Sequence, residues 1–426
     1  MNIVVIGTGY VGLAQGACLA HLGHQVVCVD VDANKVARLS EGVVPFFEPK
    51  LEDLVRQGVG EGRLSFTIDL ADAMSAKPEV VFLAVPTPQG SDGRADLGYL
   101  ESASRDLRSS IDASTLVVIK STVPPGTCKK VCEWIGGGVD VASNPEFLRE
   151  GTAVDGFLKP DRIVLGVTSA DAEQKLRDVY SNIDAPVFTM SPESAELSKY
   201  AANTFLASRL SLINEIANIA DHVGADIKHV EAALGADPRI GNKFLRSGAG
   251  FGGSCFPKDV LALDFAAREH GYEPKLIAPI IDVNNDQAGR FVKKIQSRLG
   301  SIEGKKLAVW GLAFNKGTDD VRESPAVRIV ECLLGAGATI SVFDPKAMGT
   351  ARAELGEKVT YAPSMMDALI GADALLVLTE WEEFIEVPWR AVKELLREPV
   401  IFDGKNFLPH DDLRSHGFEV IGIGVR

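Results

Sequence analysis

Residues 1–12, MNIVVIGTGYVG, decide the fold of the amino-terminal part of the chain. A β-branched strand pattern ends at Gly7, and a helical pattern follows from Gly9 onward. Gly7 and Gly9 permit a tight turn and close backbone approach to a pyrophosphate, and Gly12 lets the helix pack closely on the strand. The positive end of the helix dipole also favours phosphate. The stretch therefore predicts a Rossmann-type turn that binds a dinucleotide.

An acidic residue lies where such a turn requires one. Asp30 directly follows the next strand pattern, at 25–29, where a carboxylate accepts hydrogen bonds from the adenosine ribose. The same carboxylate would repel a 2′-phosphate, so the sequence predicts NAD rather than NADP. Asp32 is the alternative acid, although it lies beyond the predicted strand.

Strand and helix patterns alternate through the first part of the chain. Short β-branched runs lie at 3–6, 25–29, 80–85, 115–119, 139–142 and 163–167. Helical patterns or glycine- and proline-rich turns separate them, which predicts a parallel sheet with helices on both faces. Residues 1–190 are therefore expected to form an NAD-binding Rossmann-like domain.

The middle and the end of the chain complete the predicted architecture. Apolar residues recur at helical spacing from Pro192 to Gly224, a run well beyond the average globular helix. From Lys305 to Asp344, the chain repeats the order strand, glycine, helix, strand and acid found at 2–30. We predict an α/β protein with two doubly wound Rossmann-like domains, 1–190 and 300–426, joined by a long central helix within a helical segment, 191–299. Such a helix can carry dimer contacts or merely link two domains.

Composition excludes several classes of protein. The chain has 426 residues and a formal net charge of −14, which argues against nucleic-acid and anionic-membrane binding. No apolar run reaches the length of a membrane helix, and a strand pattern at 2–6 leaves no room for a signal peptide, so the cytoplasm is the expected location. The six cysteines pair with no histidine at zinc-like spacing, so no metal site is expected.

Cys255 alone among the cysteines has an unusual setting, in the stretch 248–259, GAGFGGSCFPKD. A glycine-rich loop lets a ligand contact the backbone, and Pro257 begins an amphipathic helix. Cys255 then lies at or just before a helix N-terminus beside Lys258, and both features stabilise a thiolate. Asp259 can reach the same space if the helix begins at Pro257. A buried cysteine beside a glycine turn is the alternative interpretation.

Five stretches together resemble the UDP-glucose/GDP-mannose dehydrogenase family. They are GTGYVG at 7–12, KSTVP at 120–124, NPEFLREG at 144–151, GGSCFPKD at 252–259 and TDDVRES at 318–324. Their order and spacing match across essentially the whole chain. Residues 237–245, DPRIGNKFL, resemble the branch of the family that oxidises UDP-glucose. The branch that oxidises acetamido sugars usually has a different sequence around the cysteine, so it fits less well.

The resemblance implies oxidation of a primary alcohol to a carboxylate by two NAD⁺ in succession. Catalytic roles are implied for Cys255, Lys199, Asp259, Asn203, Thr122 and Glu146. Asp259, or a water that it holds with Lys199, would remove the hydroxyl proton, and Cys255 would capture the aldehyde as a thiohemiacetal that is oxidised to a thioester. Lys199 and Asn203 would stabilise oxyanion charge. A water held by Thr122, Glu146 and Asp259 would then hydrolyse the thioester. Taken singly, Lys199 and Asn203 also fit a solvated helix face.

Binding roles follow from the same resemblance. Cofactor contacts are implied for Gly7, Gly9, Tyr10, Val11, Gly12, Asp30, Lys35, Thr87, Thr122, Glu150, Lys258 and Arg322. Contacts with a UDP-sugar are implied for Glu146, Phe147, Leu148, Lys199, Asn203, Arg239, Phe244, Leu245, Arg246, Ser247, Gly248, Gly252, Asn315, Lys316 and Lys405. In the family the counterpart of Arg239 reaches the neighbouring subunit's substrate, which implies a homodimer.

Two departures from the family pattern concern the nucleotide contacts. Phe-Lys-Pro in many relatives is Phe314-Asn315-Lys316 here, and Asp-Gly-Arg is Asp403-Gly404-Lys405. Asn315 supplies no charge, and lysine at 405 lacks the bidentate fork of arginine. GDP-mannose 6-dehydrogenase is the nearest rival. A hydroxyacid dehydrogenase would not need Cys255, and a non-catalytic nucleotide-sugar-responsive regulator would not need Lys199 or Asp259.

Overall fold

The computed structural model describes residues 1–90 and 93–425, which form two compact units. The first unit contains Met1–Ala202 and Leu261–Glu273, and the second contains Asn203–Val260 and Pro274–Arg426. Two helices, α9 (Pro192–Val223) and α11 (Phe256–Glu269), contribute residues to both units. The domain boundaries expected near residues 190 and 299 stay predictions.

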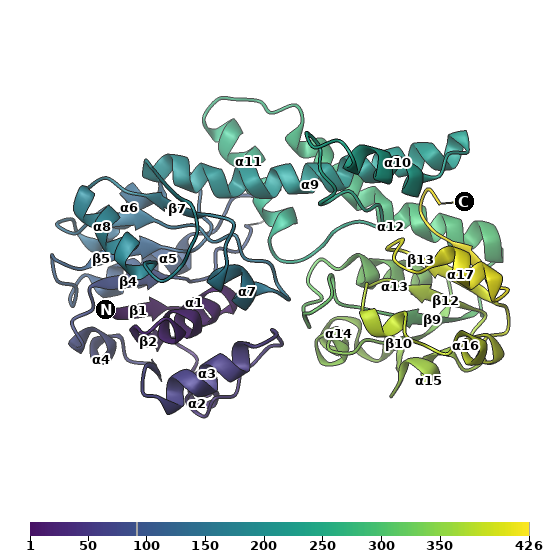
Figure 1. Ribbon diagram of the computed structural model, residues 1–426, viewed down its shortest axis with the longest axis horizontal. Helices are drawn as coiled ribbons and strands as arrows, with labels where there is room; N and C mark the ends of the chain where they lie inside the picture. The colour runs from purple at the N-terminus through teal and green to yellow at the C-terminus, as the bar shows by residue number, and fades with distance from the viewer. Residues whose placement is uncertain (91–92, 426) are drawn as a thin grey trace. The chain divides into compact units, whose positions relative to one another are not determined.

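The first unit contains a sheet with the strand order β3-β2-β1-β4-β5-β6-β7-β8 (Figure 1). The strands are β1 (Asn2–Ile6), β2 (Gln25–Val29), β3 (Leu64–Thr67), β4 (Val80–Leu83), β5 (Leu116–Ile119), β6 (Val141–Ser143), β7 (Ile163–Gly166) and β8 (Val187–Met190). The six predicted strands are present, whereas β3 and β8 were not predicted. The expectation of a purely parallel sheet is wrong at one pair, because β7 runs antiparallel to β6 through Ser143 and Gly166. The segment 144–162 therefore returns to the edge at which β6 ends.

Helices cover both faces of this sheet, as the doubly wound prediction requires. Along β1 and β4, alternate side chains enter two different buried clusters. One cluster includes α1 (Tyr10–His21), α3 (Leu51–Gly60), α7 (Ala153–Leu158) and α8 (Ala170–Val179), and the other includes α4 (Leu70–Ser75), α5 (Gly98–Leu107) and α6 (Thr127–Ile135). A strand buried on both faces reads as a continuous apolar run, which is why these strands were recognisable in the sequence.

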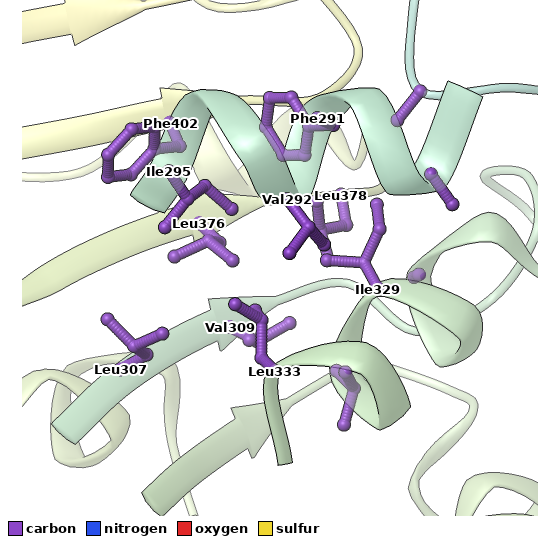
Figure 2. Packing of buried hydrophobic residues seen from close by; sticks show 14 of the residues in the cluster. Phe291, Val292, Ile295, Leu307, Val309, Ile329, Leu333, Leu376, Leu378 and Phe402 are labelled. Carbon is purple, nitrogen blue, oxygen red and sulfur yellow. The ribbon is translucent and has the colours of Figure 1, made fainter. Parts of the chain in front are cut away.

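The second unit contains a wholly parallel sheet with the order β11-β10-β9-β12-β13-β14. Its strands are β9 (Lys306–Trp310), β10 (Thr339–Phe343), β11 (Thr360–Tyr361), β12 (Ala374–Val377), β13 (Val400–Asp403) and β14 (Glu419–Ile421). On one face, Phe291 and Ile295 of α12 (Ile277–Leu299) pack over Val309 and Leu376, with Leu333 of α13 (Pro325–Gly335) beside them (Figure 2). The other face is covered by α15 (Met365–Leu369), α16 (Trp389–Leu395) and α17 (His410–Ser415).

The long helix predicted from Pro192 is present as α9, with 32 residues. The remaining helices are α2 (Ala33–Ser40), α10 (Ile227–Gly235) and α14 (Met348–Leu355), with short 3-10 turns at Gly356–Lys358 and Glu382–Phe384. Among the described residues, no helix combines the length and apolar character that crossing a membrane requires.

Candidate active site

The turn between β1 and α1 has the close packing that the glycine pattern predicts. A Cβ on Gly7, whose φ is +98°, would lie 2.5 Å from the carbonyl oxygen of Ala84, and one on Gly12 would lie 2.0 Å from that of Gly7. Gly9 is the N-cap of α1, makes no side-chain cap, and faces open space. The N–H groups of Tyr10 and Val11 therefore begin a helix with no side-chain acceptor, which fits a pyrophosphate.

Asp30 lies at the carboxyl end of β2 and is held by four donors. Its carboxylate accepts from the Thr8 N–H at 2.9 Å, the Thr8 hydroxyl at 2.5 Å, the Asp32 N–H at 3.1 Å and the Lys35 ammonium at 3.0 Å. Burial alone would raise the pKa of Asp30, but these hydrogen bonds hold it below its ordinary value. Asp32 instead caps α2, accepting from the N–H groups of Asn34 and Lys35. The ionised Asp30 fits the predicted role of discriminating against a 2′-phosphate.

Tyr10 ties this turn to the segment that follows β6. Its hydroxyl hydrogen-bonds Glu48, and Glu48 also accepts from the N–H groups of Gly151 and Ala153, both at 2.7 Å. Burial, followed by the hydrogen bond to Glu48, raises the pKa of Tyr10. The Tyr10 side chain therefore anchors the 144–151 segment. Glu48 was not predicted, since its contact with Gly151 joins residues that are about a hundred positions apart and has no local signature in the sequence.

Three predicted residues follow neighbouring strands at the carboxyl edge of the sheet. Thr87 follows β4, Thr122 follows β5 and Glu146 follows β6. The Thr87 hydroxyl donates to the carbonyl oxygen of Thr122 at 2.8 Å. In open α/β sheets, ligands bind at this edge.

Lys199 and Glu146 form a buried ion pair within the first unit. The Lys199 ammonium donates to the Glu146 carboxylate at 2.8 Å, with side-chain exposures of only 3% and 6%. The Leu148 N–H donates to the other carboxylate oxygen at 2.5 Å, and Lys199 also lies 5.6 Å from the centre of the Phe147 ring. Burial alone would raise the pKa of Glu146, but Lys199 above all holds it below its ordinary value. The alternative that Lys199 and Asn203 lie on a solvated helix face is wrong, because both are buried.

In the second unit, Cys255 lies at the N-terminus of α11. The helix begins at Phe256, one residue earlier than expected, and the Cys255 carbonyl accepts its first-turn bond from the Asp259 N–H at 2.8 Å. The thiol is partly buried, 3.6 Å from the Ser254 hydroxyl. A helix N-terminus favours a thiolate at this position.

Asp259 lies one turn into α11 and is almost fully buried. It accepts from the Asn203 amide at 2.6 Å on one oxygen and from the Lys258 ammonium at 2.5 Å on the other. Two of the predicted catalytic residues, Asn203 and Asp259, are therefore in direct contact. Because both partners are buried, removing Asn203 would take the donor from one Asp259 oxygen, and removing Asp259 would take the acceptor from the Asn203 amide.

The glycines before Cys255 are required by close packing against the segments that follow β9 and β13 in the second unit. A Cβ on Gly248 would lie 2.9 Å from the Gly404 oxygen, and one on Gly252 would lie 2.2 Å from the Glu323 oxygen. At Gly253, the Phe314 ring would be 2.8 Å away. The glycine-rich loop therefore lies directly against the segments that carry the predicted nucleotide contacts.

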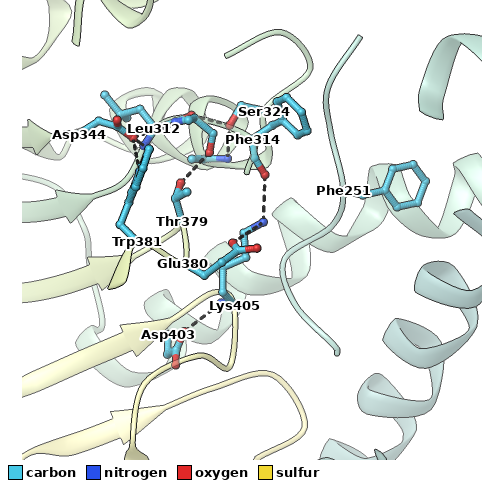
Figure 3. Close-up of polar contacts among 12 residues, drawn as sticks. Phe251, Leu312, Phe314, Ser324, Asp344, Thr379, Glu380, Trp381, Asp403 and Lys405 are labelled. Atoms are coloured by element: carbon cyan, nitrogen blue, oxygen red, sulfur yellow. Dashed lines mark hydrogen bonds and ion pairs between the residues drawn. The ribbon is translucent and has the colours of Figure 1, made fainter. Parts of the chain in front are cut away.

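The three residues that depart from the family pattern, at positions 315, 316 and 405, lie in different environments. Lys405 points inward, where its ammonium lies 3.3 Å from the Phe314 oxygen and 3.6 Å from the Glu380 carboxylate (Figure 3). Asn315 is buried in the same segment. Lys316 points outward and pairs with Glu382 at 2.6 Å. Lys405 is thus the inward cation of this region.

The other predicted residues are spread over both units. Leu245 and Ser247 are buried, and Ser247 is held by Glu231 and Asn406. Arg239, Arg246 and Phe244 are at least partly exposed, with Arg239 paired to Asp237. Arg322 pairs with Asp320, and Glu150 lies in the segment that Tyr10 anchors. No group of side chains among the described residues could hold a metal ion.

Models of a single family match the chain in three consecutive regions. Its NAD binding domain matches residues 1–184, its central domain 193–286 and its UDP binding domain 308–410. The chain is 43% identical to the UDP-glucose 6-dehydrogenase TuaD of Bacillus subtilis (strain 168), over 99% of this chain and 93% of that protein. It is also 43% identical to the UDP-glucose 6-dehydrogenase of Rhizobium meliloti (strain 1021), over 100% and 99%.

A solved structure gives the same result. The UDP-glucose dehydrogenase from the hyperthermophilic archaeon Pyrobaculum islandicum superposes with a TM-score of 0.92 at 39% identity, covering 100% of this chain and 98% of that one. Fold, dinucleotide turn and sequence similarity along the full length agree, and the protein belongs to the UDP-glucose/GDP-mannose dehydrogenase family.

Proposed function

We propose that this NAD-dependent dehydrogenase oxidises C6 of UDP-glucose to the carboxylate of UDP-glucuronate, through a thioester on Cys255. The observation that carries the proposal is Cys255 at the N-terminus of α11, with the buried Asp259–Asn203 pair one turn further. NAD⁺ bound at the glycine turn supplies the hydride acceptor in each of the two oxidations. The similarity to UDP-glucose 6-dehydrogenases along the full length favours this substrate over GDP-mannose.

The chain's own residues have one role in each step. Asp259, or a water that it holds with Lys199, takes the C6 hydroxyl proton as the first hydride leaves. The Cys255 sulfur then adds to the aldehyde carbon, and the oxygen gains a proton to give the thiohemiacetal. Loss of that proton and of a second hydride leaves the thioester. Lys199 and Asn203 stabilise the oxyanion charge that develops at these stages.

Hydrolysis completes the reaction. A water held by Thr122, Glu146 and Asp259 adds to the thioester carbon, the carbon–sulfur bond breaks, and Cys255 regains a thiol as the acid and a proton are released. Holding the aldehyde as an adduct prevents its escape between the two oxidations. Two NADH are formed for each sugar.

The proposal is tested by Cys255→Ser. Since a serine hydroxyl is a far weaker nucleophile than a thiolate, NADH formation from UDP-glucose should fall by at least about a hundredfold. NAD⁺ and UDP-glucose should still bind, and an ester that accumulates on the introduced serine is measured as an increase in intact mass. Cys332→Ser, at an exposed cysteine of the same unit, is the matched control and should behave as wild type. Near-normal formation of the acid by Cys255→Ala would refute the thioester, and faster turnover of GDP-mannose or a UDP-N-acetyl sugar would refute the substrate.

We further propose a homodimer, in the cytoplasm. The support for the homodimer is a stripe on α9 in which Phe205, Leu212 and Ile219, seven residues apart, are each more than half exposed. Apolar residues at this spacing lie on one side of a helix and are typical of a helix-pairing surface. Light scattering of Leu212→Glu should show loss of the dimer, and an active wild-type monomer at assay concentration would contradict it.

A further inference from the structure

A buried lysine outside the proposed site residues lies close to the Lys199–Glu146 pair. Lys120 directly follows β5 and is only 5% exposed. Its ammonium donates to the Asn144 side-chain oxygen at 2.9 Å and to the Tyr180 hydroxyl at 3.4 Å. Asn144 is itself fixed, because its amide donates to the Val164 carbonyl at 2.9 Å. The ammonium therefore has a defined position in the interior of the first unit.

Lys120 shares its surroundings with Glu146. Both side chains line one cavity of about 120 Å³ in the first unit, together with Tyr180. The other charged residues that line this cavity are Lys159, Asp161 and Arg162, and Lys199 faces Glu146 from α9. Burial raises the pKa of Glu146; Lys199, the hydrogen bond from Leu148 and, least of these, the charge of Lys120 lower it. Two buried cations thus act on one carboxylate.

We propose that Lys120 is a positioning residue for the oxidation, a fixed cation that keeps the Glu146 carboxylate ionised and paired with Lys199. The inference rests on the proposed function, in which Glu146 holds the hydrolytic water and Lys199 acts on the substrate oxygen. Without Lys120, the ionised form of the buried Glu146 carboxylate would depend on Lys199 and the Leu148 N–H. A carboxylate in an apolar interior with too few partners takes up a proton.

The charge of Lys120 is available in the pH range where it is needed. Burial lowers the pKa of Lys120 to about 7. The ammonium is therefore charged below neutral pH, where protonation threatens Glu146. Above neutral pH it loses its proton, but Glu146 stays ionised there without help. Lys120 therefore carries its positive charge at acidic pH, where Glu146 would otherwise take up a proton.

Lys120→Met tests the inference through the pH dependence of kcat/KM for UDP-glucose. Because loss of a nearby cation raises a carboxylate pKa, the acid limb should move up by about one pH unit, with up to roughly tenfold lower activity at the lowest pH values of that limb and little change near pH 8. Lys120→Arg keeps the positive charge, and the cavity beside it has room for the larger side chain. In this variant the acid limb should therefore return to its wild-type position. Lys175→Met, at a surface lysine bonded to the Ser114 carbonyl, should keep the wild-type profile.

An unmoved acid limb in Lys120→Met would overturn the inference. So would equal losses in the Met and Arg variants at every pH, because that pattern indicates packing alone. If Lys120→Met does not fold, Tyr180→Phe removes one hydrogen-bond partner and should move the limb in the same direction by less; no movement would again overturn it. If the wild type does not oxidise UDP-glucose, the proposed function fails. The effect of Lys120 on the pKa of Glu146 can then be measured without catalysis. Infrared spectra of the wild type and of Lys120→Met are recorded against pH, and the Glu146 carboxylate band is identified by its loss in Glu146→Gln.

Discussion

The two Rossmann-like sheets begin with the same turn and use it for different purposes. In the first unit, β1 ends at Ile6, Gly7 follows it, and α1 begins at Tyr10, with Gly9 as an N-cap that supplies no side-chain acceptor. In the second, β9 ends before Gly311, also at positive φ, but α13 begins only at Pro325. Its N-cap, Ser324, accepts from the Ala326 N–H and donates to the Leu312 carbonyl.

The aspartates that follow β2 and β10, Asp30 and Asp344, also differ in their partners. Asp30 accepts from side chains and backbone at the mouth of the turn, where Lys35 lies partly exposed. Asp344 is buried, and one of its oxygens accepts from the N–H groups of Leu312 and Ala313 and from the Trp381 indole; Asp344, Leu312 and Trp381 are labelled in Figure 3. The other oxygen accepts from the N–H groups of Lys346 and Ala347. The repeat of strand, glycine, helix and acid thus predicts the fold twice, but it indicates a dinucleotide site only where the helix N-terminus carries no internal acceptor.

The largest effect that would test this contrast is expected for Asp344→Asn. An amide nitrogen would replace one of two acceptor oxygens that face backbone and indole donors, so buried N–H groups would lose their partners. The free energy of unfolding of the second unit should fall by about 3 kcal/mol. Urea unfolding followed by tryptophan fluorescence measures it, because Trp310, Trp381 and Trp389 all lie in that unit.

Asp411→Asn, at a fully exposed acid of the same unit, is the matched control and should change the unfolding midpoint little. Equal midpoints for Asp344→Asn and this control would show that Asp344 is not the structural acceptor that its hydrogen bonds indicate.

Asp30→Ala should instead change cofactor choice. Removal of the carboxylate takes away the repulsion of a 2′-phosphate and leaves Lys35 to attract it, so the ratio of kcat/KM for NAD⁺ to that for NADP⁺ should fall by roughly a hundredfold. Asp32→Ala removes the cap of α2 and should lower stability with little change in this ratio. Parallel NADH and NADPH assays give both ratios. If Asp32→Ala changed the ratio more, the assignment of the ribose acid would move to Asp32.

How much of this could be predicted from the sequence depends on how local each determinant is. The glycine turn, Asp30 and Cys255 at a helix start each depend on a few consecutive residues. The direction of β7 depends on the route of 144–162, and the tie from Tyr10 through Glu48 to Gly151 joins distant segments, so neither has a local signature. Strands such as β11, with two residues, are too short to show a pattern.

Lys120 lies between these two cases, because its place after a buried strand can be seen in the sequence but its burial cannot. A lysine directly after four buried apolar strand residues lies at the carboxyl edge of the sheet, as does Asn144 after β6. Position alone could suggest a polar cluster there. Only the structure shows that the ammonium is buried, and that Lys316 turns outward while Lys405 turns inward.

The smallest expected effect tests the contrast between the two helix starts most directly. Gly9 has an extended backbone, with φ −68° and ψ −172°, and a Cβ there meets nothing within 4 Å, so serine fits without strain. A serine hydroxyl at this N-cap would accept from the first turn of α1, as Ser324 does in α13. Gly9→Ser should therefore leave the NAD-free protein as stable as wild type or more stable by a few tenths of a kcal/mol. It should also weaken NAD⁺ binding by about tenfold, because the hydroxyl competes with the pyrophosphate for the same N–H groups. Calorimetric titration with NAD⁺ and the melting temperature of the free protein measure the two effects separately. Ser324→Gly is the reciprocal control, which should lower stability and leave NAD⁺ affinity unchanged. Unaltered NAD⁺ affinity in Gly9→Ser would mean that the uncapped start of α1 does not distinguish the two turns.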